Sequence, residues 1–459
     1  MYVQQIYTGC LAQAAYYIES DGEAAIIDPL RDTQVYIDIA TARKAKIKYI
    51  FETHFHADFV SGHIDLVKKT GAKVVYGPQA KAAYEIVVAE DGQEFAMGKC
   101  KVQVIHTPGH TTESCCFLLK DESGKATSLF SGDTLFVGEV GRVDLAANMN
   151  LPKEQLASML YDSIEKLKKL PDDVVVYPGH GAGSACGKNI GTESTTTIGK
   201  ERKGNYALQP MSREAFVNIM VSGLETPPQY FFTDAVINRK GYEADMETLM
   251  NHNVKSLDVS AFKKEITSGT VILDTRSAED FAKEHIPGSI NIGLGGQFAI
   301  WTGTLFGKVP FLLICDDGKE NETVMRLARV GYDDVRGFLK GGIKAWKDAG
   351  NTVQSIESVS ATEFMKHIGE DKIIDVRNDG EMANGMVHDA IAMPLATLSK
   401  RLNELDKNEH YYVHCAGGYR SMIALSILQK EGFTKLTNVS GGVSAMVKAG
   451  LKLEVPEEA

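Results

Sequence analysis

The sequence contains no CxxC pair, no long apolar run and no excess of positive charge. Its seven cysteines are odd in number and widely spaced, which argues against a disulfide framework and against a cysteine-based structural zinc site. No apolar run approaches the roughly 18 residues that a transmembrane helix needs. The net charge of −11 argues against a nucleic-acid surface and an anionic membrane partner. We therefore expect a soluble protein with neither nucleic acid nor membrane as a partner.

The first ten residues, MYVQQIYTGC, also lack the basic segment and apolar stretch of a secretory signal. Together with the cysteine pattern, this favours a reducing, cytoplasmic location. The 459 residues, 44% hydrophobic and 24% charged, have the composition of an ordinary folded protein. That length is enough for about three domains of about 150 residues each.

The second half of the chain contains an internal repeat. Three motifs recur at an offset of 100 or 101 residues: an acid-x-Arg segment, a cysteine after an apolar run, and a Gly-Gly pair. The matching residues are Asp274-x-Arg276 with Asp375-x-Arg377, Cys315 with Cys415, and Gly341–Gly342 with Gly441–Gly442. Short apolar runs alternate with helical patterns in each copy, which is typical of a small parallel α/β unit. We predict two copies of one domain, at 255–352 and 356–456.

The first half has a different pattern, with many short apolar runs and helical segments between them. Residues 14–29 predict a β-hairpin, because two apolar runs flank an Asp-Gly turn. Further runs, such as IKYIFETH and DDVVVYPGH, predict strands with polar residues just beyond their ends. The Gly-, Ser- and Thr-rich stretch 184–205 predicts a loop, and 211–252 a helical extension. We expect a sandwich of sheets with helices outside, over residues 1–252.

Residue types that bind metals gather at these strand ends. They occur in four segments, THFHADF, TPGHT, SGDTLF and YPGH. Imidazole and carboxylate together suit zinc, iron and manganese. A single histidine of this kind is more often structural, but four such segments in order indicate a metal site. The candidate residues are His54, His56, Asp58, His110, Asp133 and His180.

These segments resemble the metallo-β-lactamase superfamily, whose pattern is HxHxDH, then GH, then GD, then a final histidine. The resemblance implies an αββα sandwich over roughly residues 1–240. One position departs from the pattern, because Phe59 follows Asp58 where the superfamily has a histidine. In the dinuclear zinc hydrolases that histidine and the neighbouring aspartate hold the second metal. Since phenylalanine has no lone pair to donate, we expect a site for one metal.

Among one-metal members, the segment GDTLFVGEVGRVD resembles the persulfide dioxygenases. That resemblance implies one Fe(II) per chain, held by His54, His110 and Asp133. Two histidines and one carboxylate leave open positions of the kind that iron oxygenases use. His56, Asp58 and His180 would then orient the ligands by hydrogen bonding. Arg142 is a candidate for binding the anionic substrate, with a structural ion pair to Asp144 as the alternative.

The segment Cys415-Ala416-Gly417-Gly418-Tyr419-Arg420-Ser421 follows an apolar strand and precedes a helix. Gly417 and Gly418 allow the loop to curl so that backbone N–H groups face the cysteine sulfur. A helix N-terminus and Arg420 would favour a thiolate and attract an anionic sulfur donor. Cys415 could then carry a sulfur atom as a persulfide. The alternative is a buried, inert cysteine.

This segment and the repeat around it resemble the rhodaneses. The first copy differs, because Asp316, Asp317 and Glu320 follow Cys315, and Glu320 stands where the second copy has Arg420. Carboxylates beside a thiol raise its pKa and repel an anionic donor. We therefore interpret the first copy as a degenerate rhodanese-like domain kept as a scaffold.

The order of domains resembles the fusions of persulfide dioxygenase and rhodanese. The fold class is α/β: an αββα metallo-β-lactamase sandwich followed by two rhodanese-like domains with small parallel sheets. The resemblance implies that O2 oxidises a low-molecular-weight thiol persulfide to sulfite, and that Cys415 transfers sulfur to give thiosulfate. It also implies a homo-oligomer.

Two other functions stay open. One is a zinc-dependent thioester hydrolase of the glyoxalase II type, which would need two metals. The other is a non-catalytic carrier or sensor of persulfide. Metal content distinguishes the thioester hydrolase from the dioxygenase. Oxygen uptake distinguishes the carrier or sensor from the dioxygenase.

Overall fold

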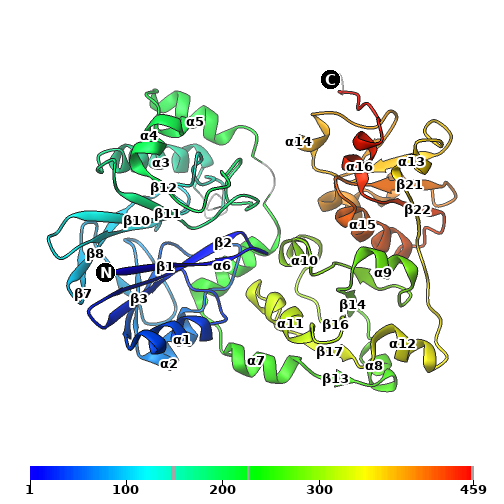
Figure 1. Ribbon diagram of the computed structural model, residues 1–459, viewed down its shortest axis with the longest axis horizontal. Helices are drawn as coiled ribbons and strands as arrows, with labels where there is room; N and C mark the ends of the chain where they lie inside the picture. Colours follow the sequence, from blue (N-terminus) through cyan, green and yellow to red (C-terminus); the bar gives the residue numbers. More distant parts are fainter. Residues whose placement is uncertain (146–150, 225–226, 456–459) are drawn as a thin grey trace. The chain divides into compact units, whose positions relative to one another are not determined.

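Figure 1 shows a computed structural model of the chain, which describes residues 1–145, 151–224 and 227–455. The chain forms two compact units. The first is Met1–Leu249 with Ala328–Gly331, and the second is Met250–Leu327 with Tyr332–Ala459. Within the described residues, no helix has the length and apolar character needed to cross a membrane.

The first unit contains two six-stranded sheets. In one, the strands lie in the order β1-β2-β3-β4-β5-β6, and in the other the order is β12-β11-β10-β9-β8-β7. The strands of the first sheet are β1 (Tyr2–Thr8), β2 (Gln13–Ser20), β3 (Glu23–Ile27), β4 (Lys46–Glu52), β5 (Lys73–Tyr76) and β6 (Val87–Val88). Those of the second are β7 (Glu94–Met97), β8 (Cys100–His106), β9 (Cys115–Lys120), β10 (Ala126–Gly132), β11 (Val175–Pro178) and β12 (Thr196–Thr197).

The predicted hairpin is confirmed as β2 and β3, which pair in antiparallel fashion from Tyr16 opposite Ile27 to Ser20 opposite Glu23. The turn residues Asp21 and Gly22 both have positive φ, at 51° and 77°. Two positive φ values match the right-handed twist of the flanking strands, which explains the Asp-Gly pair at this turn.

Three apolar clusters separate the layers of the first unit. One lies between the two sheets and includes Phe51, Phe117 and Phe130. A second covers the outer face of the first sheet against α1 and α2, and a third covers the outer face of the second sheet against α3, α4 and α5 (Figure 1). The predicted αββα sandwich is thereby confirmed. Its helices are α1 (Gln34–Arg43), α2 (His63–Thr70), α3 (Lys153–Leu167), α4 (Ile198–Gly204), α5 (Arg213–Val221), α6 (Tyr230–Lys240) and α7 (Met246–Asn253).

The stretch 184–205 was predicted to be a loop throughout, and that prediction is wrong for its last third. Thr196–Thr197 forms β12 and Ile198–Gly204 forms α4. The Thr197 side chain accepts a hydrogen bond from the Lys200 N–H and so caps α4. The same threonine composition that suggested a loop therefore supplies an N-cap. The predicted helical extension at 211–252 corresponds to α5, α6 and α7.

The second unit contains two five-stranded parallel sheets with the same topology. Their orders are β13-β17-β16-β14-β15 and β18-β22-β21-β19-β20. The first comprises β13 (Ser256–Leu257), β14 (Val271–Asp274), β15 (Ile290–Asn291), β16 (Phe311–Ile314) and β17 (Val335–Leu339), with α8 (Val259–Glu265), α9 (Ala278–Lys283), α10 (Phe298–Leu305), α11 (Glu320–Arg329) and α12 (Gly342–Asp348).

The second comprises β18 (Glu357–Val359), β19 (Lys372–Asp375), β20 (Ile391–Ala392), β21 (Tyr411–His414) and β22 (Leu436–Val439), with α13 (Ala361–Phe364), α14 (Asp379–Met382), α15 (Tyr419–Lys430) and α16 (Gly442–Lys448). Identical strand orders confirm the predicted repeat and the fold class of both copies. The boundaries 1–252, 255–352 and 356–456 stay predictions.

Candidate functional site

The polar residues singled out in the first unit follow four strands of the sandwich. His54, His56 and Asp58 come after β4, His110 comes after β8, Asp133 directly follows β10, and His180 comes after β11. All six side chains are buried. The fold therefore gathers donors from both sheets at one end of the sandwich.

His54, His110 and Asp133 form one cluster. The Asp133 Oδ2 atom lies 3.5 Å from His110 Nε2 and 4.0 Å from His54 Nε2, and one ligand atom from each residue lies within 4.8 Å of the others. Among the described residues, Asp133 Oδ2 has no hydrogen-bond partner. A buried carboxylate oxygen without a donor is costly, and a cation at the centre of the cluster would remove that cost. The three side chains therefore fit a single divalent metal.

Neighbouring groups fix the histidine tautomers so that both Nε2 atoms can bind a metal. His110 Nδ1 lies 2.9 Å from the Arg142 carbonyl, which only accepts, so this nitrogen carries the proton. Thr53 Oγ1 donates to Asp28 at 2.9 Å and can therefore accept from His54 Nδ1 at 3.0 Å. The Nε2 lone pairs of His54 and His110 are left for the centre of the cluster.

Electrostatics also favour the protonation states that metal ligands need. Burial, with repulsion from His56, lowers the pKa of His54 well below its usual value, which keeps the imidazole neutral. Burial alone would raise the pKa of Asp133, but the interaction with His180 outweighs it and lowers this pKa below its usual range. A neutral imidazole and an ionised carboxylate are the forms that bind metals.

His56 does not point into this cluster. Its Nε2 atom lies 3.0 Å from Asp28 and 3.5 Å from Glu52. Burial alone would lower the pKa of His56, but these carboxylates raise it well above its usual value. Phe59 stacks on the His56 ring, with ring centroids 4.3 Å apart. The residue that replaces the superfamily histidine thus packs against an ion-paired imidazole.

Asp28 and Glu52 were not among the residues predicted from the sequence. Each ends or follows an apolar strand of the first sheet, in the segments IIDP and YIFE. That position is the same signal that identified Asp133. Asp28, Glu52 and His56 form a second group of buried residues with metal-binding side chains.

Asp58 and His180 form a third group together with Cys186. His180 Nε2 lies 2.7 Å from Asp58 Oδ2, and His180 Nδ1 lies 2.8 Å from Asp133 Oδ1. Burial alone would lower the pKa of His180, but the two carboxylates raise it to about 10. Burial raises the pKa of the Cys186 thiol well above its usual value. Cys186 lies within the stretch 184–205 for which the sequence predicted a loop.

Arg142 forms the ion pair with Asp144 that was the alternative to a role in substrate binding. Its guanidinium forms a bidentate ion pair with Asp144, with distances of 2.7 and 2.8 Å, and donates to the Ala185 carbonyl at 3.0 Å. The preceding Gly141 passes so close to Asp133 that a Cβ atom would lie 1.9 Å from its carbonyl oxygen. This explains the glycine in GRVD. A substrate role for Arg142 stays a prediction.

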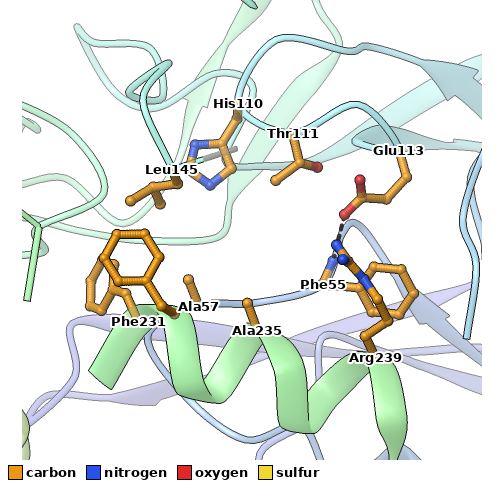
Figure 2. Close-up of a pocket in the computed structure, with 10 residues that line it drawn as sticks. Phe55, Ala57, His110, Thr111, Glu113, Leu145, Phe231, Ala235 and Arg239 are labelled. Atoms are coloured by element: carbon orange, nitrogen blue, oxygen red, sulfur yellow. Dashed lines mark hydrogen bonds between the residues drawn. The ribbon is translucent and has the colours of Figure 1, made fainter. Parts of the chain in front are cut away.

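A pocket lies beside His110 (Figure 2). Helix α6 forms one wall with Phe231, Phe232, Ala235 and Arg239. Phe55 and Ala57, which flank His56 in the chain, lie across from this helix together with Leu145. The wall next to the candidate metal centre is therefore mostly apolar, with polar groups at Glu113 and Arg239.

In the second unit, Cys415 lies at the end of β21 and is buried. The Gly418 N–H donates to Cys415 Sγ at 3.1 Å, and Ser421 Oγ lies 3.8 Å from the same sulfur. Gly418 has a φ of 101°, a conformation that favours glycine. The predicted inward N–H is therefore present at Gly418, whereas Gly417 is exposed on the loop.

Arg420 is held by a carboxylate that the sequence analysis missed. It forms a bidentate ion pair with Glu381, at 2.5 and 2.7 Å. Although burial alone would raise it, the pKa of Glu381 is lowered by Arg420. A role of Arg420 in binding an anionic donor stays a prediction. A half-buried arginine needs a partner, so the sequence could have predicted that some carboxylate pairs with Arg420. Nothing in the sequence identifies that carboxylate as Glu381.

Cys315, the corresponding thiol of the first repeat, has a different environment. Its Sγ atom lies 3.5 Å from Thr323 Oγ1. Burial, with the charges of Glu320 and Asp274, raises the pKa of Cys315 to about 11. The thiol is therefore protonated at neutral pH, and burial contributes more to the raised pKa than the carboxylates do. The degeneracy of this copy stays a prediction.

Comparison with known proteins places these sites in two families. The metallo-beta-lactamase superfamily matches residues 8–180, and the rhodanese-like domain matches residues 258–349 and 360–449. A metallo-beta-lactamase from Staphylococcus aureus subsp. aureus COL is 33% identical, with a TM-score of 0.66 over 74% of this chain and 98% of its own.

Two other solved structures match shorter parts. ETHE1 from Myxococcus xanthus is 29% identical, with a TM-score of 0.45 over 52% of this chain and 98% of its own. A rhodanese-like domain protein from Staphylococcus aureus is 35% identical, with a TM-score of 0.20 over 22% of this chain and 99% of its own. Since the chain spans nearly the full length of a relative that is 33% identical, it belongs to the metallo-β-lactamase superfamily and carries two rhodanese-like domains in addition.

Proposed function

We propose that the first unit is an iron-dependent persulfide dioxygenase and that Cys415 is the catalytic residue of a sulfurtransferase. His54, His110 and Asp133 would hold one Fe(II) ion. The observation that carries the proposal is the buried Asp133 Oδ2 atom, which has no partner among the described residues and faces two histidine nitrogens. The aromatic ring of Phe59, stacked on His56, supports a site for one metal rather than two.

When bound, such an iron would supply redox chemistry with O2 and positions for a sulfur anion. The overall reaction balances as one persulfide, one O2 and one water giving one thiol, one sulfite and two protons. The outer sulfur is oxidised, and O2 accepts its electrons. The second unit would then join sulfite to a further sulfane sulfur, so that thiosulfate is the final product.

The residues of the first unit would prepare the site for this reaction. The Arg142 carbonyl and Thr53 hold the histidine tautomers, and His180 orients Asp133 by its hydrogen bond. The pocket beside His110 would receive the thiol part of the substrate, because its aromatic and alanine side chains exclude water. Removal of water strengthens the attraction between charged groups inside the site.

Cys415 would transfer sulfur in two balanced steps. Its thiolate attacks the outer sulfur of a thiol persulfide, the S–S bond of the donor breaks, and the released thiol takes the proton while Cys415 keeps the sulfane sulfur. Sulfite then attacks that sulfur, the new S–S bond of thiosulfate forms, and the Cys415 thiolate leaves. The Gly418 N–H would stabilise the thiolate in both steps.

Anaerobic purification with metal analysis, followed by oxygen uptake and product analysis with glutathione persulfide, tests the proposal. We expect one iron per chain, oxygen uptake and sulfite. Asp133→Asn should lose iron and oxygen uptake while Cys415 still transfers sulfur. Oxygen uptake that persists without bound metal would contradict the dioxygenase assignment.

A thioester hydrolase of the glyoxalase II type is the second candidate, favoured by the group of Asp58, His180 and Cys186. This group could hold a second ion if His180 gave up one of its two carboxylate partners. The hydrolase requires two zinc ions per chain and thioester turnover in the absence of air. One iron and no thioester turnover would exclude it.

We also propose a cytoplasmic enzyme that forms a homo-oligomer and takes thiol persulfide, O2, sulfite and thiosulfate as its small-molecule partners. All seven cysteines are free, which fits a reducing compartment.

A further inference from the structure

Tyr419, the first residue of α15, reaches out of its own repeat. Its hydroxyl donates to the carbonyl of Gly293 in the first repeat, at 2.8 Å. Burial raises the pKa of Tyr419 above its usual value, so the hydroxyl remains a donor at neutral pH. The residue next to the catalytic loop is therefore hydrogen-bonded to the copy that lacks a complete loop of its own.

The Tyr419 side chain packs against the segment Gly293–Gly296, where the backbone leaves room for the ring. A Cβ atom on Gly296 would lie 2.5 Å from the Tyr419 ring, so the ring lies directly on the glycine backbone. Arg326 of α11 donates to the Leu294 carbonyl at 2.7 Å. The segment is thus also held by a contact within the first repeat.

The rest of α15 docks along the same repeat. The Asn291 N–H donates to Ser426 Oγ at 3.1 Å, and His285 Nε2 lies 2.7 Å from Gln429 Oε1. Tyr419 and Ser426 are seven residues apart, so they lie on one face of the helix. The first repeat therefore holds both the beginning and the later turns of the helix.

The beginning of α15 matters because it carries the donor to the sulfur. Gly418, whose nitrogen lies 3.1 Å from Cys415 Sγ, directly precedes Tyr419 and is the N-cap of α15. A displacement of Tyr419 therefore shifts the start of the helix, with its positive dipole end and the adjoining Gly418 donor, relative to the sulfur. The other charged groups around the Cys415 loop come from both repeats. Arg420 with its partner Glu381 and the Asp375–Arg377 pair belong to the second repeat. Glu279 and Lys283 of α9 belong to the first repeat and line a pocket together with Gly417 and Gly418.

We propose that the first rhodanese-like repeat sets the geometry of the Cys415 loop, and that Tyr419 is the positioning residue through which it does so. The inference deepens the proposed role of Cys415 and rests on it. It assigns to the first repeat a function that needs no reactive cysteine. Tyr419 acts through Gly418 and does not itself touch the transferred sulfur.

The test is carried out on the full chain with Gly296→Ala, which pushes on the ring from the first repeat, and with Gly295→Ala as the matched control. Gly295 is exposed, and a Cβ atom added to it would have no described heavy atom within 4 Å. The readouts are the pH profile of Cys415 alkylation by iodoacetamide, followed by peptide mass spectrometry, and the rate of sulfur transfer to sulfite. Metal content and oxygen uptake report that the rest of the protein is intact.

We expect Gly296→Ala to slow sulfur transfer about tenfold, since small displacements of reacting groups cost that much or more. Its alkylation profile should move up by about half a pH unit, because the sulfur loses part of its favourable contact with the donor and the helix end. Tyr419→Phe, which keeps the ring and loses one hydrogen bond, should slow transfer about two- to fivefold. Gly295→Ala should match the wild type in both readouts.

The double variant Gly296→Ala with Tyr419→Ala separates positioning from general damage. If the ring transmits the effect, Gly296→Ala adds nothing once the ring is gone. Equal additional loss in that background, or a folded Gly296→Ala variant with wild-type alkylation and transfer, would overturn the inference. If the alkylation profile moves but the wild type transfers no sulfur, the proposed function fails and the positioning role stands.

Discussion

The two rhodanese-like repeats have the same architecture and different cysteine environments. Their sheets share one strand order, and the matching strands β14 and β19 each end in an aspartate that pairs with the arginine two residues further on. The Arg–Asp distances are equal, at 2.6 Å for Arg276 with Asp274 and for Arg377 with Asp375. The scaffold has been kept in both copies.

The loops after the matching cysteines differ. Cys415 accepts a hydrogen bond from the Gly418 N–H, whereas burial and nearby carboxylates raise the pKa of Cys315 to about 11. A Cβ atom on Gly442 would lie 2.1 Å from the Cys415 carbonyl, whereas the matching Gly342 has no described heavy atom within 4 Å of such a Cβ. The same backbone therefore holds two different thiol environments, and a few loop residues make the difference.

The largest expected contrast between the repeats comes from replacing each cysteine. Cys415→Ser should abolish thiosulfate formation from persulfide and sulfite, because serine cannot carry a sulfane sulfur, while oxygen uptake continues. Cys315→Ser should leave both rates within about twofold of the wild type. Thiosulfate assays with purified variants measure this. Loss of activity in a folded Cys315→Ser protein would mean that the first repeat is catalytic.

The next contrast is in thiol reactivity. A thiol whose pKa lies at about 11 is nearly all protonated at pH 8, so Cys315 should react with iodoacetamide slowly there and faster as the pH rises toward 11. Cys415 should react at least about tenfold faster than Cys315 at pH 8, because the Gly418 N–H and the helix end favour its thiolate. Peptide-resolved alkylation rates test this. Equal rates at pH 8 would remove the distinction between the loops.

A smaller contrast concerns the paired glycines. Gly342 and Gly442 have φ values of 55° and 54°, so alanine is strained at both positions. Gly342→Ala should cost only this strain, about 1 kcal/mol of unfolding free energy. Gly442→Ala should cost about 3 kcal/mol or more, because its methyl group also meets the Cys415 carbonyl. Chemical denaturation of both variants, with sulfur transfer as a second readout, distinguishes the two. Equal losses of unfolding free energy in the two variants would show that the close approach of Gly442 to the Cys415 carbonyl does not affect stability.

The smallest expected effect is at the ion pair between Arg420 and Glu381, next to the Cys415 loop. Glu381→Gln removes the charge that holds Arg420, and it should lower stability by no more than about 1 kcal/mol because Glu381 is partly exposed. The freed guanidinium should lower the KM for thiosulfate as a sulfur donor. The matching acid of the first repeat, Asp280, provides the control as Asp280→Asn. A KM that does not change would assign Arg420 a structural role.

Some residues of the candidate metal site could be predicted from the sequence, and the contacts of others could not. His54, His110 and Asp133 were among six candidates in segments that follow strands, and the resemblance to the persulfide dioxygenases selected them as the ligands. His56 has the same local signal, yet it pairs with Asp28 and Glu52 instead of joining the cluster. Strand ends indicate which side chains reach one edge of the sandwich, but side-chain direction there depends on packing such as the Phe59 ring on His56.

By itself, the sequence determined the strand and helix pattern, the repeat, the donors beside the strands and the cysteine loop with its glycines. These depend on periodicity, turn chemistry and residue type, which act over a few positions. Only the tertiary structure decided which donors converge, which partner holds Arg420, and that Tyr419 rests on Gly296. Those contacts join residues far apart in the chain, and their geometry is set by how the layers and repeats pack against one another.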